Sequence, residues 1–184
     1  MKRIRTLGAT LLLVAIAGLV SAPGLRAASR AELDRDGERV LKKLYAGNSA
    51  ARLLGEKARA VLVFPSIIKA GFLFGGQIGE GVLFQNGRPV AYYNTVAASY
   101  GLQAGAQVFG YALFFMNDGA LAYLDKSGGW EVGIGPSIVV VDAGVGKSLT
   151  STTITQDVYA FIFDQKGLMG GLGVQGSKIT RISK

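Results

Sequence analysis

The fold is decided by residues 61–84, VLVFPSIIKAGFLFGGQIGEGVLF, which begin as a short apolar run and continue as a glycine-rich segment. We expect Phe64-Pro65 to break the first run. From Phe72 onward, most even positions carry large apolar side chains and most odd positions carry small or polar ones. Alternation with a period of two indicates a β-strand rather than a helix. The glycines predict that another backbone or a ligand approaches this strand closely.

Charged residues in and around this segment suggest two kinds of contact. Glu80 lies on the apolar face, where we expect a buried ion pair with Lys69 or Lys147 rather than a catalytic acid. We expect Lys69 in the turn that introduces the strand. Lys69, Lys147 and Lys166 each stand close to a glycine in a turn-like setting. Such turns form backbone nests that bind anions, so a phosphate site is the alternative to three solvated surface lysines.

The first 27 residues have the layout of a secretory signal peptide. A basic head precedes an apolar run at 7–20, which is short for a membrane span, and small residues follow at 21–28. A cut after Ala27 places Leu25 where a small residue is preferred, and a cut after Ala22 leaves Pro23 first. An uncleaved amino-terminal anchor is the alternative. We expect an exported protein, periplasmic or secreted and peripherally associated with a membrane.

Charge and composition narrow the function. Without residues 1–27 the chain keeps 16 of its 20 basic residues and all 12 acidic ones, a formal charge of +4. That mild excess favours an anionic membrane surface and not nucleic acid. The sequence contains no histidine and no cysteine. The usual general base, thiol nucleophile and zinc ligands are therefore missing, and we expect neither an enzyme nor a metal or other cofactor.

Two sequence segments resemble nucleotide-binding loops, but neither has all the residues or flanking elements that such a loop requires. The segment DAGVGKS at 142–148 lacks the glycine that a phosphate-binding loop needs five residues before Gly146, because Val141 stands there. GLGVQG at 171–176 matches a dinucleotide-binding pattern, but only eight residues follow it. These are too few for the helix and second strand that such a fold requires. We therefore expect no nucleotide ligand.

The remaining chain predicts an α+β fold, with amino-terminal amphipathic helices packed on a glycine-rich, mainly antiparallel β-sheet. Ser29 and Glu32 fit a capping box that begins a helix at about 29–46, and Ser49 is expected to cap a second helix at about 50–58. Docking of these helices on the sheet is favoured over a position on a membrane, since their charges nearly cancel. Asn86-Gly87 predicts a type I′ hairpin. The further predicted elements are strands at 89–93, 103–116, 130–141, 158–164 and 168–175, and a short helix at 118–126.

The order of several short segments resembles the SYLF domain family, also called the yeast actin-patch type lipid-binding domain. The matching segments are KARAVLVFP at 57–65, KAGFLFGG at 69–76, GEG at 79–81, GLQAGAQ at 101–107, GVGK at 144–147 and KGLMGG at 166–171. After the predicted signal peptide at 1–27, the resemblance divides the chain into an amphipathic helical region at 28–58 and a β-rich body at 59–184.

The resemblance implies a non-enzymatic domain that binds anionic, phosphate-bearing lipid headgroups such as phosphoinositides, and some relatives bind actin. The family's basic positions fall here on Lys69, Lys147 and Lys166. The helical region adds basic residues that we expect near the membrane: Lys42, Lys43, Lys57 and Arg59. This chain departs from the family's pattern around Phe163-Asp164 and in its basic carboxy-terminal strand. The alternative function is a structural or protein-interaction module of the envelope or extracellular space, with incidental lipid affinity.

Overall fold

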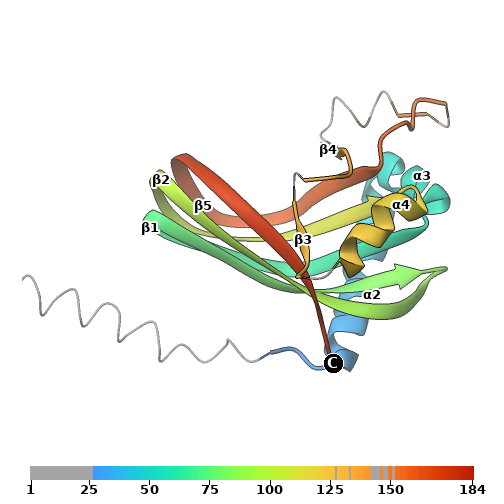
Figure 1. Ribbon diagram of the computed structural model, residues 1–184, viewed down its shortest axis with the longest axis horizontal. Helices are drawn as coiled ribbons and strands as arrows, with labels where there is room; N and C mark the ends of the chain where they lie inside the picture. Colours follow the sequence, from blue (N-terminus) through green and yellow to red (C-terminus); the bar gives the residue numbers. More distant parts are fainter. Residues whose placement is uncertain (1–26, 127, 133, 142–145, 147–148, 151) are drawn as a thin grey trace, which may run out of the picture.

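The computed structural model describes residues 27–126, 128–132, 134–141, 146, 149–150 and 152–184, with backbone alone at 102–103 and 170–175. The chain is α+β and contains a curled, mixed sheet (Figure 1). Its helices are α2 (Arg30–Gly47), α3 (Ser49–Lys57), α4 (Asp118–Leu121) and the 3-10 helix η1 (Ala122–Asp125). Its strands are β1 (Ala60–Gln85), β2 (Arg88–Phe115), β3 (Trp130–Glu131), β4 (Ile138–Val140) and β5 (Val158–Ile182).

Three long antiparallel strands form most of the sheet. The order is β1-β2-β5-β3, and β4 pairs with β5 in parallel. The predicted strands at 89–93 and 103–116 are both parts of β2, and those at 158–164 and 168–175 are both parts of β5. The predicted break at Pro65 is wrong, because β1 continues through it with a register shift between Phe64 and Ile67. An edge strand tolerates proline at such an irregularity, since no ladder hydrogen bond is lost.

The three long strands curve back on themselves at one end of the molecule, on the left in Figure 1. A Cβ added at Gly81 would lie 2.7 Å from the carbonyl oxygen of Val63, and one at Gly79 would lie 3.0 Å from that of Ser66. The second half of β1 therefore lies directly against its first half, as the glycines predicted. The bend includes Leu73, whose φ of 61° is in the left-handed region.

The hairpin between β1 and β2 confirms the turn prediction. Asn86 and Gly87 have φ angles of 50° and 74°, the two positive values that a type I′ turn requires. The predicted helix at 118–126 is present as α4 followed by η1. The predicted strand at 130–141 is wrong in extent, because the described residues of that region form only the short strands β3 and β4.

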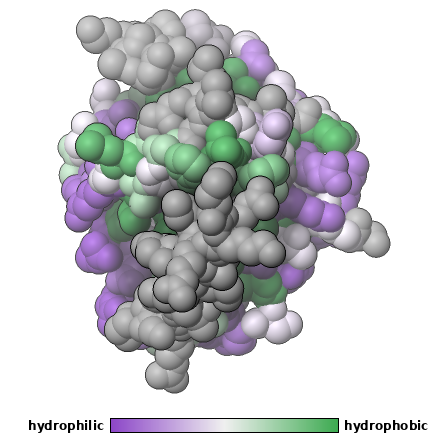
Figure 2. All heavy atoms as spheres, turned by 90° about the vertical axis from the view of Figure 1, so that its left-hand side faces the viewer, coloured by the Kyte–Doolittle hydropathy of each residue, from purple (hydrophilic) through white to green (hydrophobic). Residues whose placement is uncertain are grey.

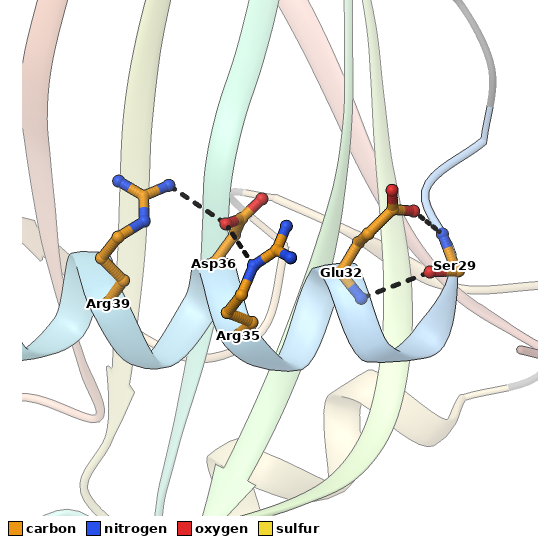
Figure 3. Close-up of polar contacts among 5 residues, drawn as sticks. All are labelled: Ser29, Glu32, Arg35, Asp36 and Arg39. Carbon is orange, nitrogen blue, oxygen red and sulfur yellow. Dashed lines mark hydrogen bonds and ion pairs between the residues drawn. The ribbon is translucent and has the colours of Figure 1, made fainter.

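The first helix begins at the predicted capping box. The Ser29 hydroxyl accepts a hydrogen bond from the Glu32 amide at 3.3 Å, and the Glu32 carboxylate accepts one from the Ser29 amide at 2.7 Å (Figure 3). Each side chain thus satisfies a backbone N–H that the first helical turn leaves unpaired. The cap of α3 is Asn48 and not the predicted Ser49, since the Asn48 side chain accepts from the Ala51 amide at 3.0 Å.

Helix α2 contacts the second half of β1. Gly37 is buried, and a Cβ there would overlap Val82 and touch the ring of Phe84. The hydroxyl of Tyr92 donates a hydrogen bond of 2.8 Å to Asp34 of the same helix. The glycine that weakens the helix locally therefore lets it approach the strand. Among the helices that the structure describes, none is sufficiently long and apolar to cross a membrane.

Side chains on the two faces of β1 enter two separate hydrophobic cores. Leu62 and Phe64 join one cluster with the aromatic side chains of Tyr93, Phe115 and Trp130. Alternate residues of β1 point to the other cluster, which contains Val61, Val63, Val82, Phe84, Phe114 and Phe161 together with buried residues of α2 and α3.

Candidate functional site

The curved ends of the three long strands expose large apolar side chains. We call this region the strand tip and define it as residues 66–78 of β1, 96–108 of β2 and 165–178 of β5. The four most exposed large side chains in it are Phe72 at 74%, Phe74 at 70%, Tyr100 at 65% and Leu168 at 89%. Ile68, Ile78, Val96 and Val108 are also exposed. Exposed apolar residues gathered in one region are typical of an interaction surface.

The register places these side chains on one face of the sheet. Phe74 is opposite Tyr100, where the two rings lie 5.0 Å apart between centroids. Ile68 is opposite Val108, which is in turn opposite Lys166. Figure 2 views the molecule from the tip, and hydrophobic surface gathers across the upper part of this face with hydrophilic residues on its flanks.

Close backbone contacts also occur within the strand tip. A Cβ on Gly71 would lie 2.7 Å from the carbonyl oxygen of Phe74, three residues further along the bend of β1. A Cβ on Gly105 would lie 2.8 Å from the Cα of Met169, its register partner in β5. Glycine at these two positions therefore lets the backbone bend and pair closely at the tip.

The strand tip carries positive charge and no acidic residue. Its only charged residues are Lys69, Lys166 and Lys178, so its formal charge is +3. Lys166 is exposed and forms no hydrogen bond or ion pair within the described part of the chain. Lys178 is also exposed and stands opposite Glu131 of β3 in the sheet register. An apolar surface bordered by lysines favours an anionic, amphipathic partner.

Lys69 lies within β1, on the inner face of the sheet. The prediction that it lies in a turn is therefore wrong. Lys69 lines a cavity of about 280 Å³ together with Gln77, Gln107, Gln165 and Ser177. Among the described residues that line this cavity there is no carboxylate. Tyr111 also borders it, and burial raises the pKa of that phenol to about 12, so the hydroxyl stays neutral.

The predicted lipid-contacting residues do not form one cluster. Lys69 and Lys166 occupy successive register positions, opposite Gln107 and Val108, and therefore point to opposite faces. Lys166 is also part of β5 and not of a turn, and Lys147 lies outside the described residues. Lys69 and Lys166 therefore do not share one face of the sheet, and their contact with lipid phosphate stays a prediction.

Three of the four predicted basic residues from 29–59 form ion pairs with described residues, and the partner of Lys43 directly precedes the β5 part of the strand tip. Lys42 pairs with Glu38 at 3.9 Å, Lys43 with Asp164 at 2.6 Å and Arg59 with Asp118 at 3.7 Å. Lys57 is exposed at the end of α3.

Glu80 forms an ion pair, but its partner is Lys184. The Lys184 ammonium lies 2.8 Å from Glu80 Oε1, and the two side chains are 10% and 26% exposed. The amide of Ala28 donates a second hydrogen bond to Glu80 Oε2 at 2.9 Å. Lys69 does not take this place, because it lines the inner cavity. Glu80 thus joins both ends of the described chain to β1.

Sequence reasoning missed the aromatic residues of the strand tip. The alternation placed Phe72 and Phe74 on the apolar face of a strand, but it did not indicate that this face is exposed. Glycines on the alternate positions were the available signal, since they let backbones meet and so turn the apolar side outward. Tyr100 and Leu168 carried no signal of their own, because their places depend on pairing with strands distant in sequence.

Comparison with known proteins bears on the second half of the chain. A family model described as Ysc84, Las17-binding protein actin regulator, matches residues 96–184. This segment begins within β2 and includes the parts of the strand tip that β2 and β5 contribute. No curated protein matches the chain. Within the described residues no group of three metal-ligating side chains occurs.

Proposed function

The carboxy-terminal half of this chain belongs to the Ysc84, or SYLF, family of binding domains, and from this premise we propose that the protein binds anionic lipid at a membrane surface through its strand tip. The observation that carries the proposal is the exposure of Phe72, Phe74 and Leu168 in a region that has three lysines and no acidic residue. The family supports a lipid- or actin-binding role in general, and the choice of lipid rests on this surface.

The apolar side chains of the strand tip insert into the membrane, and the exposed Lys166 and Lys178 remain at the headgroups. Complete burial of a Phe or Leu side chain contributes roughly 1.5–3 kcal/mol. Each lysine near an anionic surface adds about 1 kcal/mol, an attraction that falls off within a Debye length. Lys166 lies on the same face as the exposed apolar residues, so both contributions act in one orientation. The protein is accordingly proposed to be exported and held peripherally at a membrane.

The amino-terminal helices have a lesser role in this arrangement. Leu33 and Val40 of α2 are 4% and 5% exposed, and Leu54 of α3 is fully buried. Their apolar faces therefore serve the core. The exposed side of α2 carries charges of both signs, several of them paired, as Asp36 is with Arg35 and Arg39 (Figure 3). Membrane contact by this region is limited to electrostatics.

Vesicle co-sedimentation tests the proposal. Wild type is compared with a Phe72→Ala, Phe74→Ala, Leu168→Ala triple variant on neutral and phosphatidylglycerol-containing vesicles, at about 50 and 300 mM salt. We expect binding to anionic vesicles only, weakened at high salt, and a loss of at least tenfold in the triple variant. All proteins carry the same amino terminus, so any contribution of residues 1–27 cancels in the comparison.

Matched controls test whether vesicle binding depends on the strand tip or on any exposed apolar or basic side chain of the protein. Val90→Ala removes an apolar side chain that is 46% exposed on the hairpin side, and it should bind as wild type does. Lys166→Ala should reduce the salt dependence of binding to anionic vesicles, whereas Lys57→Ala should leave that dependence nearly unchanged. Phosphoinositide vesicles of equal total charge should bind no better than phosphatidylglycerol. Unchanged binding by the triple variant would refute the proposed surface.

A protein-interaction module is the second candidate, because the family's description names a protein partner and actin regulation. The same exposed rings, Phe74 and Tyr100, are suited to packing against protein. Sedimentation with actin filaments, and concentration-dependent self-association, distinguish this candidate. The protein-interaction role is favoured if the protein does not bind vesicles and the triple variant loses binding to actin filaments or self-association.

A further inference from the structure

The two ends of the described chain meet at one carboxylate. Glu80 Oε2 accepts a hydrogen bond of 2.9 Å from the Ala28 amide. Glu80 Oε1 accepts a hydrogen bond of 2.8 Å from the Lys184 ammonium. The same ammonium donates to the Ala28 carbonyl oxygen at 2.7 Å. We call these three residues the terminal clasp. Figure 1 shows the carboxy terminus beside the start of α2.

The clasp lies at the point where the sequence predicts the end of a signal peptide. Ala27 is exposed and Ala28 is partly buried, so the chain passes from solvent into the fold between these two residues. The next amide is also held, because Ser29 donates to Glu32 at 2.7 Å (Figure 3). Two successive backbone N–H groups thus point to two carboxylates, which fixes the direction of the chain at this boundary.

We propose that the Ala27–Ala28 peptide bond is a processing site and that Glu80 is the receptor for the amino terminus that cleavage creates. A leader peptidase adds water across this amide bond. The carboxylate leaves with Ala27, and the amine remains on Ala28, where it takes up a proton at neutral pH. The atom that now donates one neutral hydrogen bond to Glu80 becomes an ammonium facing the same oxygen.

The geometry suits this conversion without rearrangement. A carboxylate has two oxygens and accepts up to four hydrogen bonds, and here each oxygen has a different donor. Lys184 occupies Oε1, so it leaves Oε2 to the new ammonium. Ala27, Ala28 and Glu80 line one cavity of about 340 Å³, which leaves space beside the new ammonium. A charge-assisted bond is stronger than the neutral one that it replaces.

The processed protein supplies the first test. The full chain is produced with export, and its intact mass and terminal peptide are determined by mass spectrometry. We expect a chain that begins at Ala28. A chain that keeps its first residues, or that begins at another residue, would overturn the proposed site. Because this readout involves no lipid, it is independent of the vesicle experiment.

Amine labelling tests the receptor. Near pH 7 an acylating reagent reacts with α-amines in preference to lysines, whose usual pKa is about 10.4. The Ala28 amine of the processed protein should react about tenfold more slowly than that of Glu80→Gln. Lys184→Met removes the neighbouring cation and should keep the amine protected. Glu80→Asp, which retracts the carboxylate, should give an intermediate rate and serves if Glu80→Gln does not fold, as judged by circular dichroism. Equal rates in wild type and the folded Glu80 variants would refute the receptor.

Discussion

Alanine at Gly81 tests whether close contact between the two halves of β1 holds the fold together. A Cβ at this position would lie 2.6 Å from Cδ1 of Phe64 and 2.7 Å from the carbonyl oxygen of Val63. Ordinary van der Waals contact is about 3.4–4.0 Å, so something must move. Phe64 is fully buried and the carbonyl belongs to the strand, so neither has a free direction in which to retreat.

The magnitude follows from two opposing effects. Overpacking a well-packed core costs about 1–3 kcal/mol. Replacing glycine with alanine returns about 0.4–1 kcal/mol, because the unfolded chain loses conformational freedom. We therefore expect Gly81→Ala to lower the free energy of unfolding by about 1–2 kcal/mol. In a domain of this size that corresponds to a decrease in Tm of roughly 2–8 °C.

Gly76→Ala is the matched control in the same strand. The nearest atom to a Cβ there is the carbonyl oxygen of Ala97, at 3.8 Å, and its backbone needs no left-handed φ. This variant should be as stable as wild type or slightly more stable. Thermal melts and guanidinium titrations of both variants provide the measurement. If Gly81→Ala is as stable as Gly76→Ala, the two halves of β1 do not pack as closely as described.

Two further predictions concern the helix contact and the acid stability. Gly37→Ala should destabilise the protein despite the better helix propensity of alanine, because its Cβ overlaps Val82, whereas Gly47→Ala meets no atom within 4 Å and should add up to about 1 kcal/mol. Chemical denaturation compares the two, and equal stabilisation would contradict the helix contact. Hydrogen bonds from the Ser137 amide, then from the Asn117 and Ser137 side chains, hold the pKa of Asp157 below its usual value. This contribution is present above about pH 4 and is lost as the pH falls through the lowered pKa, so Asp157→Asn should lower Tm at pH 7 and the difference should shrink toward pH 2. A difference that stays constant across melts from pH 7 to pH 2 would contradict this.

Local sequence was sufficient wherever the determining interactions are between near neighbours. The capping box at Ser29 and the turn at Asn86-Gly87 involve residues within three positions of each other, and both are present. Alternation around Phe72 indicated a strand because the period of side-chain direction is a property of the backbone itself. The resemblance to the family was also found at this level, and the family model matches residues 96–184.

Only the tertiary structure decided which face of those strands is buried. The pairing of Phe74 with Tyr100, and the approach of Gly81 to Phe64, bring together residues 17 or more positions apart. No local pattern contains these contacts. For the same reason the sequence indicated an ion pair at Glu80 but not its partner, Lys184, which lies 104 positions away. The sequence by itself determined the strands, the turn and the family. The bend and the pairing of the sheet decided that the aromatic side chains face outward and that Lys69 and Lys166 lie on opposite faces, because both outcomes depend on the register between strands that are distant in sequence.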